Sequence, residues 1–176
     1  MLSYGCENLT KINIPKNIKV INSRTFGSCR NLTETTIESI LSNIEIIERE
    51  AFSECDSLRN IVIPGNIKTI GSEAFWGCDN LTSVKIGSSV ESIESLAFSA
   101  TNLKSIYIPS TVDNVEAYNG GRIFDGKRFH TIANPDTIIY FGHDSKPEGW
   151  SDLYNESETC KYGYTYEEYE AEINNL

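Results

Sequence analysis

The stretch Cys55–Phe75 reads CDSLRNIVIPGNIKTIGSEAF, and a shift of 23 residues nearly superimposes it on Cys78–Phe98, which reads CDNLTSVKIGSSVESIESLAF. The same frame recurs upstream over Cys6–Phe26 and Cys29–Phe52, and in eroded form over Ala100–Tyr118. Self-similarity at a period of about 20–50 residues is typical of stacked repeats. The sequence therefore predicts a repeat solenoid.

Each repeat carries two short apolar patterns. In Leu9–Ile14 the last two apolar residues alternate with polar ones, which predicts a half-buried strand, and Pro15 ends it because proline has no N–H. The second pattern, as in Ile67–Ile70, precedes an Ala-Phe pair such as Ala74–Phe75, for which we expect a tight helical or 3₁₀ turn that carries the ring inward. Stacking of the coils then buries the apolar side chains of each repeat, which stabilises the fold by about 1.5–3 kcal/mol per fully buried large side chain.

The second repeat departs from this rhythm. It runs for 26 residues from Cys29 to Cys55, with Thr35 where the other repeats have isoleucine and Glu38–Leu41 where the others have proline and a few polar residues. Two interpretations remain open: a bulged, tolerated loop, or a specificity insert on one face of the stack.

The C-terminal part leaves the pattern. We expect residues 1–118 to form about five coils, the first incomplete, residues 119–150 a degenerate last coil and cap, and residues 151–176 a tail. Thr137–Phe141 predicts the last strand of the stack, and Thr165–Glu168 a capping box before a short acidic helix that ends near Ile173. Large side chains available to cover the open end are Trp150, Tyr154 and Tyr162.

The cysteines follow the repeat, apart from Cys160. They occur once per repeat at the same phase, and we assign Ala100 to this position in the fifth repeat. This spacing favours buried, reduced thiols that pack as small hydrophobic groups over a disulfide framework or a Cys-x-x-Cys metal site. The four cysteines of the series are Cys6, Cys29, Cys55 and Cys78.

The motif Leu-x-x-Ile-x-Ile-Pro-x-x-Val/Ile-x-x-Ile-x-x-x-Ala-Phe-x-x-Cys resembles the BspA-like (Treponema pallidum-type) leucine-rich repeats over roughly residues 2–118. The clearest copies are Leu58–Cys78 and Leu81–Ala100. The resemblance implies a right-handed leucine-rich-repeat stack of coils of about 23 residues, mostly β, with an atypical C-terminal cap. It also implies a surface or secreted protein of the adhesion type. The family has no catalytic residues that could be assigned to positions in this sequence.

Composition excludes several classes of function. A net charge of −10 and a pI near 4.7 argue against binding to nucleic acid or to anionic lipid, both of which require basic surfaces. No run approaches the roughly 20 apolar residues of a membrane-spanning helix. The segment Met1–Cys6 lacks the features of a signal peptide and looks like the end of a repeat, so we expect this chain to come from a longer array.

Catalytic chemistry has little support in the sequence. His130 and His143 have no serine or cysteine nucleophile at a recognisable spacing, and we interpret His143–Asp144 near Asp136 as a polar turn rather than a metal site. We therefore predict no enzyme activity, no metal and no cofactor. Three Asn-Leu-Thr triplets match the N-glycosylation pattern but arise from the repeat itself; they begin at Asn8, Asn31 and Asn80.

The remaining functional feature is the exposed face of the predicted sheet. Alternate residues of the strands form two columns, and such extended solenoid faces are what repeat proteins use to bind. We predict binding to a host or cell-surface protein or glycan there, with Tyr107 favoured because aromatic residues are enriched at binding hot spots. The alternative is a structural spacer without a ligand of its own. The columns comprise Lys11, Glu34, Asn60, Ser83 and Ser105, and Asn13, Thr36, Val62, Lys85 and Tyr107.

Overall fold

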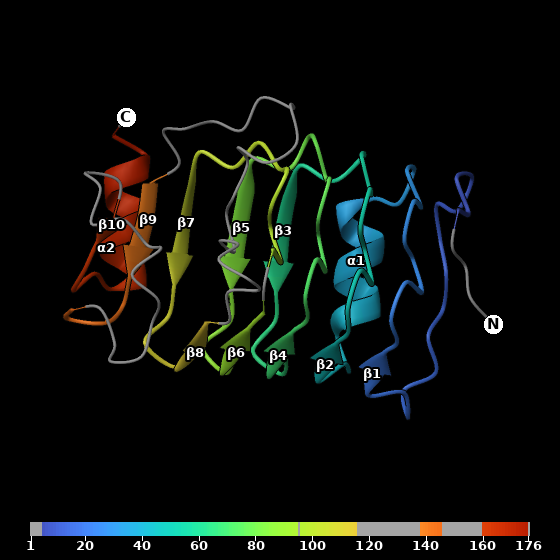
Figure 1. Ribbon diagram of the computed structural model, residues 1–176, viewed down its shortest axis with the longest axis horizontal. Helices are drawn as coiled ribbons and strands as arrows, with labels where there is room; N and C mark the ends of the chain where they lie inside the picture. Colours follow the sequence, from blue (N-terminus) through green and yellow to red (C-terminus); the bar gives the residue numbers. More distant parts are fainter. Residues whose placement is uncertain (1–4, 95, 116–137, 146–159, 176) are drawn as a thin grey trace.

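The computed structural model describes residues 5–94, 96–115, 138–145 and 160–175. In these ranges the chain winds into a parallel β-solenoid whose coils contribute strands to two five-stranded sheets, which we call sheet A and sheet B. Successive coils follow one another along the long axis of the molecule (Figure 1). The predicted fold class, a mostly-β stack of coils of about 23 residues, is confirmed.

Sheet A contains the short strands of the second apolar pattern, two residues from each coil. Its strands pair in parallel and in register, so that Ile47, Ile70 and Ile93 form one row inside the stack. The order is β1 (Val20–Ile21), β2 (Ile46–Ile47), β4 (Thr69–Ile70), β6 (Ser92–Ile93) and β8 (Asn114–Val115).

Sheet B contains the longer strands of the first pattern. Pro64 and Pro109 directly follow two of them, as the missing N–H of proline predicts. The order along the sheet is β3 (Asn60–Ile63), β5 (Ser83–Ile86), β7 (Ser105–Ile108), β9 (Ile138–Phe141) and β10 (Cys160–Lys161). The predicted last strand is therefore present as β9, but β10 adds one more parallel strand beyond it.

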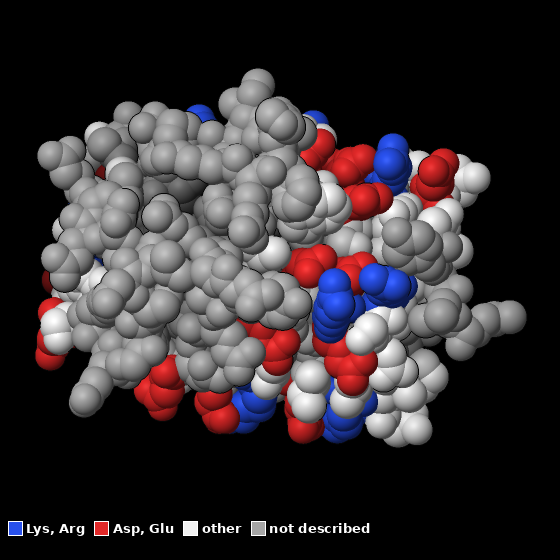
Figure 2. Space-filling view, viewed as in Figure 1, with Lys and Arg blue, Asp and Glu red and all other residues white. Residues whose placement is uncertain are grey.

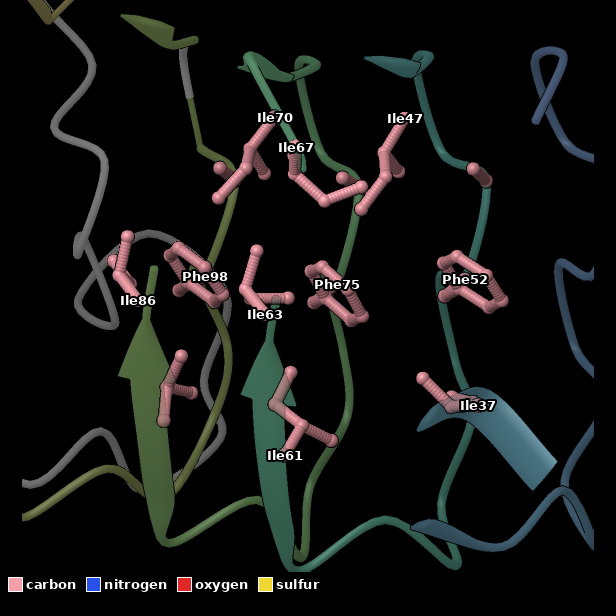
Figure 3. Close-up of a cluster of buried hydrophobic side chains, with 14 of the residues drawn as sticks. Ile37, Ile47, Phe52, Ile61, Ile63, Ile67, Ile70, Phe75, Ile86 and Phe98 are labelled. Carbon is pink, nitrogen blue, oxygen red and sulfur yellow. The ribbon is translucent and has the colours of Figure 1, made fainter. Parts of the chain in front are cut away.

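The core lies between the two sheets. Phe52, Phe75 and Phe98 are buried in the turns after sheet A, and their rings stack with centroids 5.4 and 5.5 Å apart, close to the spacing of neighbouring strands. Figure 3 shows these rings in one row, flanked by isoleucines of both sheets. One coil alone could not bury such a ring, so each coil is stabilised by its neighbours.

The second repeat forms a helix where a strand was expected. Helix α1 (Glu34–Leu41) takes the place of a sheet B strand and lies beside β3. Its buried residues Ile37, Ile40 and Leu41, with Ile44, follow the i, i+3, i+4, i+7 spacing of an amphipathic helix, and Ile37 points into the core beside Phe52 (Figure 3). The interpretation as a bulged loop was wrong, because this stretch has a helical apolar period.

The helix also ends sheet B. Residues 9–14 of the first repeat carry the predicted strand motif, yet no strand forms there. Leu9, Ile12 and Ile14 still pack against the core as partly buried side chains. A helix offers no extended backbone edge, so we attribute the missing strand to the lack of a partner in the next coil.

The cysteine series is mostly buried, as predicted. Cys29, Cys55 and Cys78 are fully buried, whereas Cys6 is exposed, and none of these four described cysteines is in a disulfide. The Sγ atoms of Cys55 and Cys78 each lie 3.3 Å from a carbonyl oxygen, that of Phe26 and of Phe52. Burial raises the pKa of the Cys78 thiol to about 12, so these sulfurs are packing groups.

The assignment of Ala100 to the cysteine position was wrong. Ala100 has φ = 53°, a left-handed conformation shared by the residue before each cysteine, such as Gly77 (φ = 69°). Thr101 therefore occupies the cysteine position, and the turn before Leu103 is one residue shorter than the turn between Cys78 and Leu81.

The C-terminal helix forms as expected. Helix α2 (Tyr166–Ile173) begins with the predicted capping box, in which Thr165 Oγ1 accepts from Glu168 N and a Glu168 carboxylate oxygen accepts from Thr165 N. Tyr162, just before it, stacks on Phe141 at 4.9 Å and covers this end of the core. Trp150, Tyr154 and both predicted domain boundaries, at residues 118/119 and 150/151, lie outside the described residues, as do His130 and Asp136.

Candidate interaction surface

The outer face of sheet B carries two columns of side chains that alternate with the core residues. Strand pairing is parallel and in register, so a position in one strand lies beside its counterpart in the next. One column begins with Asn60 and Ser83 and continues through Ser105 to Ile138. The other, which we call the central column, comprises Val62, Lys85, Tyr107, Tyr140 and Lys161.

The first two coils do not extend these columns. Lys11 and Asn13 are exposed but belong to no strand, and Glu34 and Thr36 lie in α1. Thr36 is buried, with Oγ1 donating to the carbonyl oxygen of Thr10 at 2.7 Å, so its predicted exposure was wrong. A strand had been expected here, and the helical geometry turns this side chain inward.

Glu34 supports the neighbouring strand. Its Oε1 accepts the backbone N–H of Arg59 at 2.8 Å, just before β3. Partial burial of this carboxyl opposes ionisation, but the backbone amides of Glu34, Arg59 and Asn60 prevail and lower its pKa. Glu34 is thus better explained as part of the junction between α1 and β3 than as a ligand contact.

Tyr107, the favoured binding residue, is not available on the surface. Only 8% of it is exposed, because α2 packs across the outer face of sheet B. Its ring meets the rings of Tyr166 and Tyr169 at 5.5 and 5.8 Å, and its hydroxyl donates to the carbonyl oxygen of Tyr164 at 3.0 Å. The prediction of an exposed Tyr107 was wrong, because the tail folds back over the sheet.

Charged and hydroxyl groups hold the same helix to the sheet. The Nζ of Lys85 lies 3.9 Å from the Tyr166 ring centroid, a cation–π contact, and Ser105 Oγ lies 3.2 Å from the Tyr169 hydroxyl. Lys161 donates to Glu172. These contacts cover the C-terminal half of both columns.

The titration behaviour of this junction follows from its contacts. The hydrogen bond from Lys161 lowers the pKa of the Glu172 carboxyl, and the same bond raises the pKa of Lys161. Tyr140 also donates to Glu172, at 3.1 Å; burial, then this bond, raises its pKa. The pair is therefore ionised and the tyrosine neutral at neutral pH.

A strip of the sheet stays open between the two helices. It contains Asn60 and Val62 of β3 and Ser83 of β5, and we call it the open strip; Lys85, which contacts Tyr166 of α2, lies at its edge. Val62 is 41% exposed at the centre of a strand, one of three large hydrophobic residues with such exposure among the described residues. Partly exposed apolar and hydroxyl side chains on a rigid sheet suit a macromolecular contact more than a small polar ligand.

Two members of the central column were not predicted from the sequence. Tyr140 and Lys161 lie in register with Tyr107 but were not assigned to the columns. Tyr140 could have been found by aligning Ile138–Phe141 with Ser105–Ile108, because both stretches carry tyrosine at the third position. Lys161 carries no such signal, since β10 has only two residues.

Charge pairs cross from coil to coil on another part of the surface. Glu50 accepts from Arg24 at 2.7 Å and from Arg49 at 2.9 Å, and Arg49 reaches Glu73 at 3.2 Å. The hydrogen bond from Arg24 is the main cause that lowers the pKa of the Glu50 carboxyl. Acidic and basic side chains stand together on the described part of the face in Figure 2, which leaves no block of a single charge there.

Two of the Asn-Leu-Thr triplets have structural roles. The Nδ2 of Asn31 donates to the carbonyl oxygen of Glu7 at 2.6 Å, and that of Asn80 to Asp56 at 2.8 Å. Both amides therefore join one coil to the preceding coil, and their interpretation as repeat residues agrees with this geometry. Asn8 is exposed.

The described residues bring no group of three His, Cys, Asp or Glu side chains together as a metal site. Neither of the two eight-residue helices in the described part of the chain is long and apolar enough to cross a bilayer. The strands are parallel and recur at the period of the leucine-containing repeat, the phenylalanine rings stack in a row, and a helix caps one end. These features define the molecule as a leucine-rich-repeat solenoid.

The family model of the BspA type leucine rich repeat region matches residues 3–119 in six copies. The chain therefore belongs to the BspA-type leucine-rich-repeat family, as the resemblance of the repeat motif indicated. No curated protein matches the chain.

Two solved structures are similar to this chain, and the first agrees with this assignment. A leucine rich cell surface protein from Faecalibacterium prausnitzii is 32% identical with a TM-score of 0.57, and the match covers 64% of this chain. The pneumococcal vaccine antigen PcpA is 23% identical over 78% of this chain, with a TM-score of 0.49. This chain covers 30% of the length of each of these two proteins, so it corresponds to a part of them.

Proposed function

We propose that this chain is a non-catalytic binding module of a bacterial cell-surface or secreted protein, and that it contacts a host or cell-surface protein or glycan through the open strip. The observation that carries the proposal is Val62, an apolar side chain with 41% exposure on a sheet face bounded by α1 and α2. The described relative from Faecalibacterium prausnitzii is a cell surface protein, which supports the location.

The spacer remains the second candidate, and a specific observation favours it. Backbone hydrogen bonds join the Phe turns of consecutive coils, as from Phe26 N to Ala51 O at 2.9 Å and from Phe52 N to Ala74 O at 2.8 Å. Together with the stacked rings they make a stiff stack that could hold another domain at a distance. Val62 lies beside Lys85 on the four-residue strands of sheet B, whereas the exposed Ile46 lies in a two-residue strand of sheet A. The broader face around Val62 favours the binding module.

Two matched substitutions test the open strip. Val62 of sheet B and Ile46 of sheet A are strand residues with 41% and 38% exposure, so glutamate at either position changes the surface to a similar degree. We expect the full chain to bind saturably to one member of a panel of matrix proteins, glycans and whole cells. Val62→Glu should weaken this binding by at least tenfold, as expected for the loss of a central contact, and Ile46→Glu should leave it unchanged.

Other outcomes overturn part or all of the proposal. Equal binding by both variants places the binding surface away from the open strip. Absence of binding to every target favours the spacer. Circular dichroism and thermal melting of both variants serve as the control, since an exposed site should change stability by only about 0.5 kcal/mol.

A further inference from the structure

Helix α2 belongs to a hydrophobic cluster separate from the main core. Its buried residue Tyr169 packs with Tyr107 and Tyr140 of sheet B, while the phenylalanine row and the isoleucines form the other cluster. The cluster under α2 also includes the half-buried Tyr164 and Tyr166. The helix can therefore leave the sheet without opening the core between the two sheets.

The two sides of this junction are chemically complementary. The sheet supplies two lysines and two tyrosines of the central column: Lys85, Tyr107, Tyr140 and Lys161. The helix supplies tyrosines and glutamates, with Tyr166 against Lys85 and Glu172 against Lys161. The sheet surface beneath α2 thus matches a short acidic segment that carries tyrosines.

The helix itself has little intrinsic stability. It has eight residues, and isolated helices shorter than about 12–15 residues are marginal in water. Its last turn carries no basic residue, and Glu172 lies there near the negative end of the helix dipole. The capping box and the contacts with sheet B therefore hold α2 in place, and its release requires only local opening.

We propose that the sheet surface beneath α2 is a docking site for acidic, tyrosine-bearing polypeptide segments, and that α2 is its exchangeable occupant within the chain. A partner segment of this chemistry displaces α2 and takes over its contacts with the sheet. The sheet residues in these contacts are Tyr107, Tyr140, Lys85 and Lys161. This surface continues directly from Val62 of the open strip along the central column. The inference rests on the proposed function, because it assigns a partner chemistry to the same sheet face.

The test uses a peptide of residues 163–175, labelled with fluorescein, and the full-length chain. In the wild-type protein α2 competes with the peptide, so binding measured by fluorescence anisotropy should be weak. Tyr169→Ala removes the one buried residue of α2 and should raise the affinity for the peptide at least tenfold. A peptide with serine at positions 166 and 169 should not bind.

Matched substitutions on the sheet identify the surface. In the Tyr169→Ala background, Lys85→Glu should abolish peptide binding, because it places a like charge against the acidic peptide. Lys68→Glu is the control, since Lys68 is an exposed lysine directly before β4 of sheet A. It pairs with Glu91 at 2.7 Å. Equal peptide binding by these two variants overturns the proposal.

Hydrogen exchange gives an independent measurement. The α2 amides of the wild-type protein should exchange at least tenfold faster than those of β5, since their opening is local. Exchange of both elements at one rate identifies α2 as a permanent cap and overturns the proposal. If Tyr169→Ala fails to fold, Tyr166→Ser, at a half-buried position, replaces it.

Failure of this inference can be separated from failure of the proposed function. Val62→Glu lies outside the surface that α2 covers and should leave peptide binding intact. Loss of target binding in Val62→Glu together with absence of peptide binding in Tyr169→Ala retains the binding module and rejects the exchange of α2. Peptide binding by Tyr169→Ala together with absence of binding to every external target retains the exchange of α2 and rejects the binding module.

Discussion

Two left-handed residues in each turn set the shape of the Phe turns. The first precedes the Ala-Phe pair, as at Glu50 and Glu73, and the second precedes the cysteine, as at Glu54 and Gly77. Only glycine adopts this conformation without a steric cost, of about 1–2 kcal/mol for other residues. The fold therefore accepts backbone strain at these positions in exchange for aligned phenylalanine rings.

A reciprocal pair of substitutions tests this account of the Phe turns. Gly77→Ala should destabilise the chain by about 1 kcal/mol, because alanine is strained at φ = 69°. Ala100→Gly should stabilise it by a smaller amount, about 0.5 kcal/mol, since glycine relieves the strain but gains freedom in the unfolded chain. Urea unfolding measures both. Destabilisation by Ala100→Gly would contradict the equivalence of Ala100 and Gly77.

The two helices determine which part of sheet B faces solvent. Helix α1 ends the sheet on one side because it gives β3 no strand partner, and α2 covers the outer face of β7 and β9 on the other. Both have eight residues, and each depends on packing against the solenoid. The extent of the exposed face is therefore a property of these contacts.

The docking of α2 should depend on pH. The folded pKa of the Glu172 carboxyl is lowered by Lys161, so its contribution is complete above the ordinary glutamate value of 4.5 and is lost as the pH falls through the lowered value. We expect near-ultraviolet circular dichroism of the tyrosines to decrease between about pH 5 and 3. Glu172→Gln should flatten this step; a step of the same size in the variant would contradict the assignment.

The whole molecule is a linear stack, so its stability should vary along its axis. The first coil lacks a sheet B strand, and its apolar residues Leu9, Ile12 and Ile14 are only partly buried, whereas Ile61 and Ile63 of β3 are buried. Stability in such stacks is approximately a sum of coil and neighbour terms. The ends of the stack should therefore open before its centre.

Hydrogen exchange resolved by residue measures this gradient. Amides of residues 11–14 should exchange at least tenfold faster than those of residues 60–63, because opening of the first coil exposes fewer buried side chains. Phe75→Ala, in the centre, should cost about 3–5 kcal/mol and raise exchange throughout the stack. One common exchange rate in the wild-type protein would show that the described coils unfold as a single unit.

Much of this architecture could be predicted from the sequence, because each repeat carries the same local information. The alternation in Ser83–Ile86, the proline that ends strands such as β3 and the recurrent Ala-Phe pair each depend on residues close together in the chain, and every coil repeats them. The helical spacing of Ile37, Ile40, Leu41 and Ile44 was also present, but it was obscured by the expectation of another strand.

Short-range patterns in the sequence specify the coil, the core residues, the capping box and the alternation of the sheet face. How much of that face is open depends instead on tertiary packing, since Tyr107 is buried by Tyr166 and Tyr169 from about sixty residues further along the chain. Local periodicity specifies which way a side chain points from its strand. It contains nothing about which distant segment will pack against that side, because that choice depends on complementarity between surfaces that exist only after the coils have stacked.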